Sequence, residues 1–508
     1  MSTMTTLSRR ELLRRAGALS VAAPAAPFAL NLAAMGQAAA AGAGDYKALV
    51  CLFMTGGNDA YNTVLATDTA SWAAYNAARN YGSDPVNLAA PGAAAKPASA
   101  IFHETLGGVL PIVPAHAQGR SFAVHPLLGG VRDLFAAGRL GIVANVGPLV
   151  CPTAKADYAN VSFPRPPKLF SHADQQSVWQ TFTNGGDAPG WGGRLADLIL
   201  AGNQKAMFSA ISVNGNAPFL TGQQARQYQL SVNGSIHLGG TDGTLYGSAL
   251  VQQKLQSLTR GTRGVSILEK DHAAVMARSI DADAVLSAAL PGPTAGAWGT
   301  AGLAAGAADP LLTYRNPDTG ATELNPLAQQ LQAVARMIAA RGTLGQQRQV
   351  FFVSADDFDT HDGQPRRHAV NMARLAHALA YFDATLGKMG VTPNVTTFTA
   401  SDFGRGFTSN GDGTDHGWGG HHFVMGGAVK GGDLYGTFPT YGTVDRTGTY
   451  NSPDQITNGA MLPTTSVDQY AATLGRWFGV SDANLSTIMP NLGRFDAGVR
   501  QLGFLAGA

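Results

Sequence analysis

The sequence predicts an α/β fold with a doubly wound, mostly parallel central sheet and helices on both faces. Two observations predict this class. Short apolar runs alternate along the chain with longer stretches of helical spacing, which is the rhythm of an α/β protein. Three largely apolar runs, 46–54, 349–354 and 395–400, lead into glycines, aspartates or histidines. Because parallel strands are buried on both faces and bind ligands at their carboxyl ends, these runs predict central strands with a site at one end of the sheet.

The composition limits the classes of partner. The 508 residues are 45% hydrophobic and 13% charged, include 63 glycines and carry a formal net charge of +2. This length suits one large domain with insertions. The small net charge gives no electrostatic basis for binding nucleic acid or an anionic membrane. Cys51 and Cys151 can form one disulfide, although the apolar run around Cys51 favours a buried, inert thiol.

Residues 1–42 have the features of an export signal. Arg9 and Arg10 form a twin-arginine pair, and the weakly apolar segment 16–34 and the small-residue run 38–41 follow. These features predict export of the folded protein by the twin-arginine translocase to the periplasm or the cell exterior, with an uncleaved anchor as the alternative. The mature chain, 43–508, is then expected to be a single domain without a transmembrane segment.

The first predicted strand, 46–54, leads into the segment GGND, which ends at Asp59. This position puts Asp59 where a parallel sheet would place a ligand. Alternatively, Asn58 and Asp59 only cap the helix that follows. Further along, the helical spacing at 125–135 and the apolar run at 138–146 predict another helix and another strand.

Ser171 stands at the front of a predicted helix. The N–H groups at that helix end can hold an anion beside Ser171. The alternative is that Ser171 is simply the N-cap of the helix.

The sequence of the block at about 205–320 contains no feature that indicates a substrate. It is rich in glycine, alanine and proline, with a strand-like piece at 207–213 and helical spacing at 266–290. We expect this block to be an insertion or cap that covers one side of the core and shapes substrate access.

The second half of the chain repeats the alternation of helix and strand. A predicted helix at 326–341 precedes the strand at 349–354, and apolar residues from Met372 to Leu386 recur three and four apart in the next helix. A short strand at 423–425 and a helix at 469–478 follow. The loop after the 349–354 strand carries Asp356, Asp357, Asp359, His361 and Asp362.

The segment 398–436 has the composition of a metal or phosphate site. Its acidic and imidazole side chains are Asp402, Asp412, Asp415, His416, His421 and His422. Such ligands suit divalent metals, and glycines let the backbone approach a ligand closely. The alternative is a polar surface loop with incidental histidines. A calcium loop at 410–415 is a further interpretation, but His421 stands where an EF-hand has its bidentate glutamate.

Several motifs together resemble one bacterial family. They are, in chain order, the twin-arginine signal, GGND at 56–59, Ser171-His172 with Trp179, FDTH at 358–361, SDFGR at 401–405, GTDHG at 413–417 and GGAVKGG at 426–432. As a set, over nearly the whole mature chain, they are similar to the exported family called domain of unknown function 1501. That family resembles, more distantly, the alkaline phosphatase and sulfatase superfamily, whose α/β core usually holds two divalent metals beside a Ser, Thr or modified Cys nucleophile.

This distant resemblance implies a metal site and a nucleophile. Ser171 takes the position of the nucleophile. The implied metal ligands, counting replacements for a second site, are Asp59, Asp359, His361, Asp402, Asp415, His416 and His421. Zinc is the first choice of metal, with manganese and calcium as alternatives.

The chain also departs from the superfamily pattern. Phe403 stands where many members have a ligating His or Asn, so the second metal site is either rebuilt with Asp415 or His416 or absent. The spacing of Asp359 and His361 is tighter than usual. There is no Cys-x-Pro-x-Arg signature, so formylglycine chemistry is not expected.

The resulting expectation is an exported, metal-dependent hydrolase of phosphate or sulfate esters, acting on a small molecule or a polymer. Arg405 would bind a substrate oxygen as a fork donor, or it would only neutralise Asp402. The rival expectation is a non-catalytic exported binding or assembly protein that keeps the fold and at most one structural metal.

Overall fold

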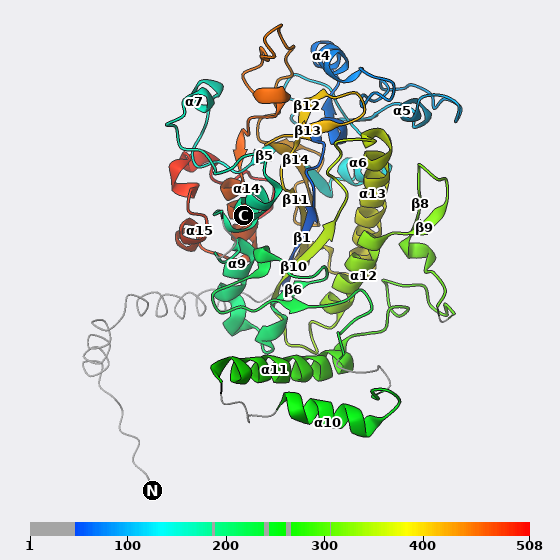
Figure 1. Ribbon diagram of the computed structural model, residues 1–508, viewed down its shortest axis with the longest axis vertical. Coiled ribbons are helices and arrows are strands. Elements are labelled where there is room, and N and C mark those ends of the chain that lie inside the picture. Colours follow the sequence, from blue (N-terminus) through cyan, green and yellow to red (C-terminus); the bar gives the residue numbers. More distant parts are fainter. Residues whose placement is uncertain (1–45, 185–187, 238–242, 261–265, 305, 508) are drawn as a thin grey trace, which may run out of the picture.

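A twisted central sheet organises the protein (Figure 1). The computed structural model describes residues 46–184, 188–237, 243–260, 266–304 and 306–507, so the predicted export signal at 1–42 lies outside the described residues. Within these ranges the sheet has nine strands in the order β15-β5-β14-β11-β1-β10-β6-β7, with β16 beside β5. They are β1 (Lys47–Met54), β5 (Leu140–Gly147), β6 (Ala210–Ser212), β7 (Tyr228–Gln229), β10 (Arg348–Ala355), β11 (Val395–Ser401), β14 (Gly420–Met425), β15 (Leu434–Tyr435) and β16 (Thr465–Ser466).

The sheet is mostly parallel, as predicted. β1 lies between β10 and β11 and pairs in parallel with both, while β14 runs antiparallel to its neighbours β11 and β5. Seven of the eight residues of β1 are buried, which explains its continuous apolar sequence. The three strands predicted from the sequence therefore form the centre of the sheet, and their carboxyl ends lie side by side.

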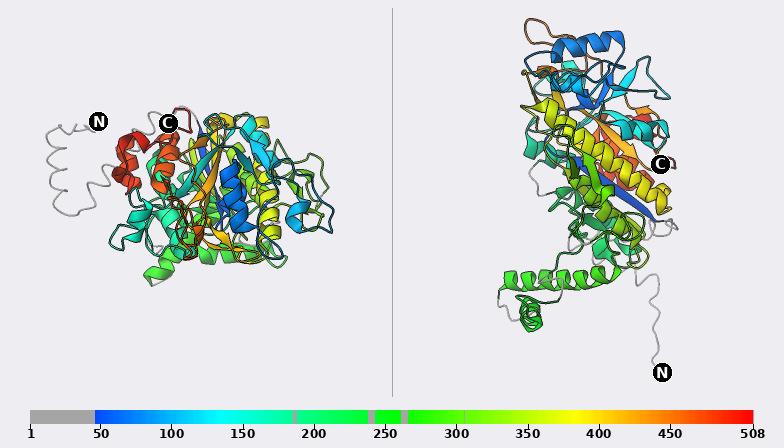
Figure 2. Two further views of the ribbon diagram at one scale, coloured as in Figure 1. Left: turned by 90° about the horizontal axis from the view of Figure 1, so that it is seen from above. Right: turned by 90° about the vertical axis from the view of Figure 1, so that its right-hand side faces the viewer.

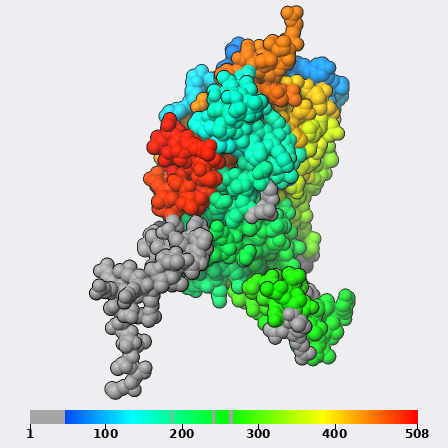
Figure 3. All heavy atoms as spheres, turned by 60° about the vertical axis from the view of Figure 1, so that its left-hand side comes forward, coloured from blue at the N-terminus to red at the C-terminus, as the bar shows by residue number. Residues whose placement is uncertain are grey.

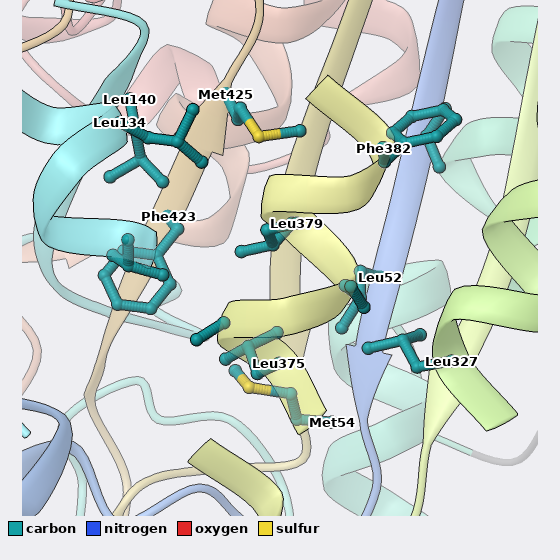
Figure 4. Close-up of a cluster of buried hydrophobic side chains, with 14 of the residues drawn as sticks. Leu52, Met54, Leu134, Leu140, Leu327, Leu375, Leu379, Phe382, Phe423 and Met425 are labelled. Atoms are coloured by element: carbon teal, nitrogen blue, oxygen red, sulfur yellow. The ribbon is translucent and has the colours of Figure 1, made fainter. Parts of the chain in front are cut away.

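Helices cover both faces of the sheet, as predicted (Figures 1 and 2). Alternate residues of β1 point to opposite faces, so Leu52 and Met54 pack in one core and Cys51 and Phe53 in the other. Figure 4 shows Leu52 and Met54 beside Leu375 and Leu379 of α13. The first core includes residues of α6 (Gly129–Ala136), α12 (Pro326–Ala339) and α13 (Gln364–Lys388), and the second includes residues of α9 (Trp191–Ile199) and α14 (Val467–Phe478).

The chain forms further helices and strands, and Figure 3 shows one side of the molecular surface coloured by sequence. The other helices are α3 (Ala60–Thr63), α4 (Thr69–Arg79), α5 (Phe102–Thr105), α7 (Lys155–Ala159), α8 (His172–Thr181), α10 (Ala249–Thr259), α11 (Ile267–Ala289) and α15 (Asp482–Ile488). The other strands are β2 (Val64–Ala66), β3 (Leu110–Ile112), β4 (Phe122–Val124), β8 (Thr313–Arg315), β9 (Thr322–Leu324), β12 (Arg405–Ser409) and β13 (Thr414–His416). The 3-10 helices are η1 (Leu200–Gly202), η2 (Ala206–Phe208), η3 (Pro218–Leu220), η4 (Pro310–Leu312), η5 (Thr392–Asn394), η6 (Thr457–Gly459), η7 (Leu492–Arg494) and η8 (Ala497–Val499).

The block at about 205–320 contributes both to the central sheet and to a separate helix pair. Its strands β6 and β7 extend the central sheet beyond β10. Its helices α10 and α11 lie at the end of the molecule opposite the β12–β13 hairpin (Figures 1 and 2). This helix pair lies away from the carboxyl ends of β1, β10 and β11. A cap function for the block stays a prediction.

The histidine-rich segment 398–436 is also more ordered than a loop. It contains the antiparallel hairpin of β12 and β13 and the strand β14. His421 and His422 are buried within β14, whereas the sequence interpretation put them in front of the strand. Glycines and polar residues concealed the alternation of these strands.

Two further features concern the cysteines and the membrane. Both cysteines are free thiols, and Cys51 is buried in the middle of β1, as its apolar surroundings favoured. Among the described residues, no helix combines the length and apolarity needed to span a bilayer.

Candidate metal centre

The ends of β1, β10 and β11 meet at one glycine. Gly56, just after β1, donates its N–H to Asp402 Oδ2 at 3.1 Å, and its carbonyl accepts from Arg405 Nη1 at 3.2 Å. Gly56 has φ +113°, and a Cβ at this position would lie 2.4 Å from the backbone nitrogen of Asp359. Only glycine allows this approach and this φ angle, so the GG segment brings the three strand ends together.

His172, Asp359 and His416 form the centre of the site. Each offers one ligand atom, and these atoms lie within 4.8 Å of one another. Nε2 of His172 lies 3.4 Å from Asp359 Oδ2, and Nε2 of His416 lies 3.4 Å from Asp359 Oδ1. The three side chains come from α8, from the loop after β10 and from β13. Two imidazoles and a carboxylate are a ligand set that suits zinc and other borderline divalent metals.

The other ring nitrogen of each histidine is held by an oxygen acceptor. His416 Nδ1 lies 2.7 Å from the carbonyl oxygen of Phe170, and His172 Nδ1 lies 2.8 Å from Asp402 Oδ2. An acceptor at Nδ1 requires the proton there, which leaves the Nε2 lone pair of the neutral ring facing Asp359. Metal-binding histidines in proteins have this same outer support.

Asp402 lies behind His172 and not in the cluster itself. It is fully buried, and its Oδ2 accepts from His172, from Gly56 N and from Gln176 Nε2, the last at 2.9 Å. Its Oδ1 has no hydrogen-bond partner among the described residues. Burying a carboxylate is costly unless positive charge compensates it. A cation held by His172 would supply that charge, so the residues present fit a divalent metal.

Arg405 holds Asp359 in place. Its side chain is fully buried, and Nη1 donates to Asp359 Oδ1 at 2.6 Å. Partial burial opposes ionisation of Asp359, but the hydrogen bond and the charge of Arg405 outweigh it, so the pKa of Asp359 is lowered. The remaining contacts of Arg405 are to Gly56 and Thr414. Arg405 therefore neutralises Asp359, not Asp402, and it does not extend toward solvent as a fork donor for substrate.

His361 and Asp415 lie on the solvent side of the cluster. His361 Nε2 is 2.8 Å from His416 Nε2 and 3.1 Å from Asp359 Oδ1, so His361 is placed to serve as a fourth ligand. Asp415 Oδ1 is 3.5 Å from His361 Nδ1, and 60% of the Asp415 side chain is exposed. The ring of Phe403 packs against the rings of both His172 and His416.

Asp59 and His421 are not part of the cluster. Asp59 is fully buried in a two-pronged ion pair with Arg79, with distances of 3.1 and 2.9 Å. His421 is buried in β14, where Nδ1 accepts the N–H of Asn145 and the ring stacks on Phe438. Both were predicted as metal ligands, but each is held by partners elsewhere in the core, and neither lies in the cluster.

Ser171 is the N-cap residue of α8, as one interpretation had it. Its Oγ donates to Asp174 Oδ2 at 2.7 Å. The neighbouring carbonyl of Phe170 contacts His416, and the next residue, His172, enters the cluster. The helix start thus contributes to the site through the residues on either side of Ser171.

Sequence reasoning missed His172 and Gln176 as site residues. They lie four apart on α8, so they share one face of that helix, and both contact Asp402. The sequence feature that could have indicated His172 is the Ser171-His172 pair at the start of a predicted helix. Only the serine of this pair was considered as a site residue.

In the segment 410–415, which was also interpreted as a calcium loop, the side chains of Asn410 and Asp412 are occupied by hydrogen bonds to the backbone. Asn410 Oδ1 accepts the backbone N–H groups of Asp412 and Gly413. Asp412 Oδ2 accepts from Gly363 N at the start of α13. These side chains form the turn between β12 and β13 and connect it to α13.

Comparisons with solved structures give remote similarities. A structure from work on the metabolism of multiple glycosaminoglycans by Bacteroides thetaiotaomicron is 9% identical, with a TM-score of 0.31 over 87% of this chain and 74% of that chain. Ps i-CgsB in complex with k-i-k-neocarrahexaose is 10% identical, with a TM-score of 0.31 over 88% and 76%. A 2-O GAG sulfatase is 9% identical, with a TM-score of 0.28 over 86% and 71%.

One family model matches most of the chain. No curated protein matches the chain. The family described as "Protein of unknown function (DUF1501)" matches residues 46–489, which include all the residues of the site. The protein belongs to the DUF1501 family.

Proposed function

We propose that this protein is a hydrolase of phosphate or sulfate esters that uses a divalent metal held by His172, Asp359 and His416. The observation that carries the proposal is the orientation of the two imidazoles, whose Nδ1 atoms are held by Asp402 and by the Phe170 carbonyl. Both Nε2 atoms are thereby directed at one carboxylate. The motif resemblance to the alkaline phosphatase and sulfatase superfamily adds the substrate class and an alkaline-phosphatase-like fold.

The ligand types favour zinc, with manganese next, because imidazole is a poor ligand for calcium. When bound, such an ion polarises an ester oxygen and lowers the pKa of a water nucleophile. Arg405 keeps Asp359 ionised and in place. His361, with 45% of its side chain exposed, would complete the ligand set on the solvent side of the site.

Water is the nucleophile in this proposal, because Ser171 Oγ is hydrogen-bonded to Asp174. Replacing Ser171 by Ala tests this choice. A variant that retains ester hydrolysis supports water, whereas loss of turnover with metal still bound assigns the attack to Ser171.

The proposed location is the periplasm or the cell exterior, reached through the twin-arginine translocase. The basis is the pair Arg9 and Arg10 in residues 1–42. Replacing both arginines by lysine should retain the protein in the cytoplasm, as measured by cell fractionation.

Elemental analysis of the purified protein tests the metal. Wild-type protein and the His421→Ala variant should carry one equivalent of zinc or manganese, and His172→Ala and His416→Ala should lose it. His116→Ala is the surface control, because the His116 side chain is 83% exposed, and it should keep the metal. A folded wild-type protein that stays metal-free after zinc and manganese are added back would refute the hydrolase proposal and leave the binding or assembly protein as the explanation.

A further inference from the structure

A chain of buried hydrogen bonds joins Asp59 to the candidate metal centre. Gln364 Nε2 donates to Asp59 Oδ2 at 2.5 Å, and Gln364 Oε1 accepts from Thr414 Oγ1 at 2.7 Å. Arg405 then donates to Thr414 through Nε, at 3.4 Å to Oγ1, and through Nη2 to the carbonyl oxygen. The chain ends where Arg405 Nη1 meets Asp359.

Solvent does not interrupt this chain. Asp59, Gln364, Thr414 and Arg405 all have 0% exposed surface. A buried polar chain is sensitive to each member, because a lost partner leaves a donor or acceptor unsatisfied where water cannot replace it. Arg79 holds the far end by its ion pair with Asp59.

Within this hydrogen-bond chain, Gln364 is difficult to substitute because both its backbone and its side chain make contacts. It is the first residue of α13, and its backbone N–H donates to the carbonyl of Asp412 in the hairpin turn. Its side-chain amide has a donor and an acceptor on one group, which meets the carboxylate of Asp59 and the hydroxyl of Thr414 together. Glutamate would oppose Asp59 with a second negative charge, and leucine would offer neither contact.

We infer that Gln364 is a positioning residue for the metal centre, which acts through Thr414 and Arg405 on the oxygen atoms of Asp359. This inference rests on the proposed function, because it assigns Asp359 the role of a metal ligand. It also gives Asp59 a function outside the ligand set, as the fixed end of the chain that orients the site.

Binding of Co²⁺ tests the inference, because its visible absorption spectrum reports the ligands and their geometry. Gln364→Leu should weaken Co²⁺ binding about tenfold, the scale of an outer support, and change the spectrum. The control is Gln455→Leu, since Gln455 is equally buried and bonds to Tyr61 and Gly442. It should leave affinity and spectrum unchanged. Wild-type affinity and spectrum in folded Gln364→Leu would overturn the inference.

Two further variants keep the test decisive. If Gln364→Leu does not fold, Thr414→Val removes the same hydroxyl contact with little change of shape. Weaker Co²⁺ binding in Thr414→Val supports the inference, and unchanged binding overturns it.

If the wild-type protein binds no Co²⁺, zinc or manganese, the proposed function fails, but a double-variant cycle of Gln364→Leu and Asp359→Asn still measures the connection. Each variant changes the folding equilibrium constant by some factor relative to the wild type. The factor for the double variant should differ at least about threefold from the product of the factors for the two single variants. Effects that multiply within error would overturn the role of Gln364.

Discussion

His172 and Asp402 are joined by a hydrogen bond of 2.8 Å between Nδ1 and Oδ2, and the opposite nitrogen of the same ring faces Asp359 at 3.4 Å. Asp402 is fully buried, whereas 32% of the His172 side chain is exposed. The imidazole thus connects a buried carboxylate to a partly open cluster. The hydrogen bond to Asp402 raises the pKa of His172, so protons compete with a metal for Nε2, and the metal should bind more weakly as the pH falls.

Replacing Asp402 by Asn should weaken zinc binding about 10–100-fold, because the ring of His172 loses its charged support. Competition with a chromophoric chelator measures the affinity. Asp454→Asn is the control, since Asp454 accepts from the backbone of Thr440 and lies outside the cluster. Zinc affinity equal to that of the wild type would show that Asp402 does not support the site.

Replacing Arg79 by Met should lower the free energy of unfolding by about 3–5 kcal/mol, because Asp59 would be left as a buried charge without its cation. Arg132→Met breaks an ion pair with Asp133 in which both side chains are exposed, and it should change stability by less than about 1 kcal/mol. Urea unfolding of the two variants makes the comparison. Similar losses would contradict the buried ion pair.

Replacing Gly56 by Ala should destabilise the protein by at least about 2 kcal/mol more than replacing Gly92 by Ala. Both glycines have positive φ, at +113° and +80°, but a Cβ at Gly92 meets nothing within 4 Å. Both variants carry the cost of a positive φ, so the extra loss in Gly56→Ala reports mainly the close contact with Asp359. Equal losses in thermal or urea unfolding would mean that the strand ends relax around a methyl group.

Acid should destabilise the fold through two histidines of β14. Burial lowers the pKa of both His421 and His422 to about 3. The unfolded chain takes up these protons near pH 6.5, whereas the folded chain stays neutral. The stabilising effect is therefore complete above about pH 6.5 and is lost as the pH falls toward 3.

Each ring should lower the free energy of unfolding by about 1.4 kcal/mol per pH unit in that range. Urea unfolding at pH 7, 6 and 5 should give a steeper decline for the wild type than for His422→Gln. Identical slopes would contradict the neutral buried state of His422.

Local patterns predicted much of the fold. The apolar runs that became β1, β10 and β11 are buried on both faces, and burial leaves a continuous apolar signature in the sequence. The spacing from Met372 to Leu386 likewise predicted α13, whose apolar face packs on the sheet. The hairpin of β12 and β13 escaped prediction because glycines and bound polar side chains replace the usual alternation.

The site was predicted less completely because its partners are distant in the chain. His172 meets Asp402 across 230 residues, and nothing local to either residue indicates the contact. Asp59 and Asp402 both follow apolar strands, so both were predicted to be metal ligands. The structure separates them from the cluster, since Arg79 neutralises Asp59 and His172 covers Asp402.

The sequence by itself determined the α/β class, the central strands and the end of the sheet where acidic and imidazole side chains gather, because hydrophobic periodicity is a local property of the chain. Only the tertiary structure decided which of those side chains face one another. Ligand geometry depends on the packing of α8, β13 and the loop after β10 around Gly56. The pairing of each buried carboxylate with its own donor depends on distances of a few ångströms, and these arise only when the strands and helices assemble.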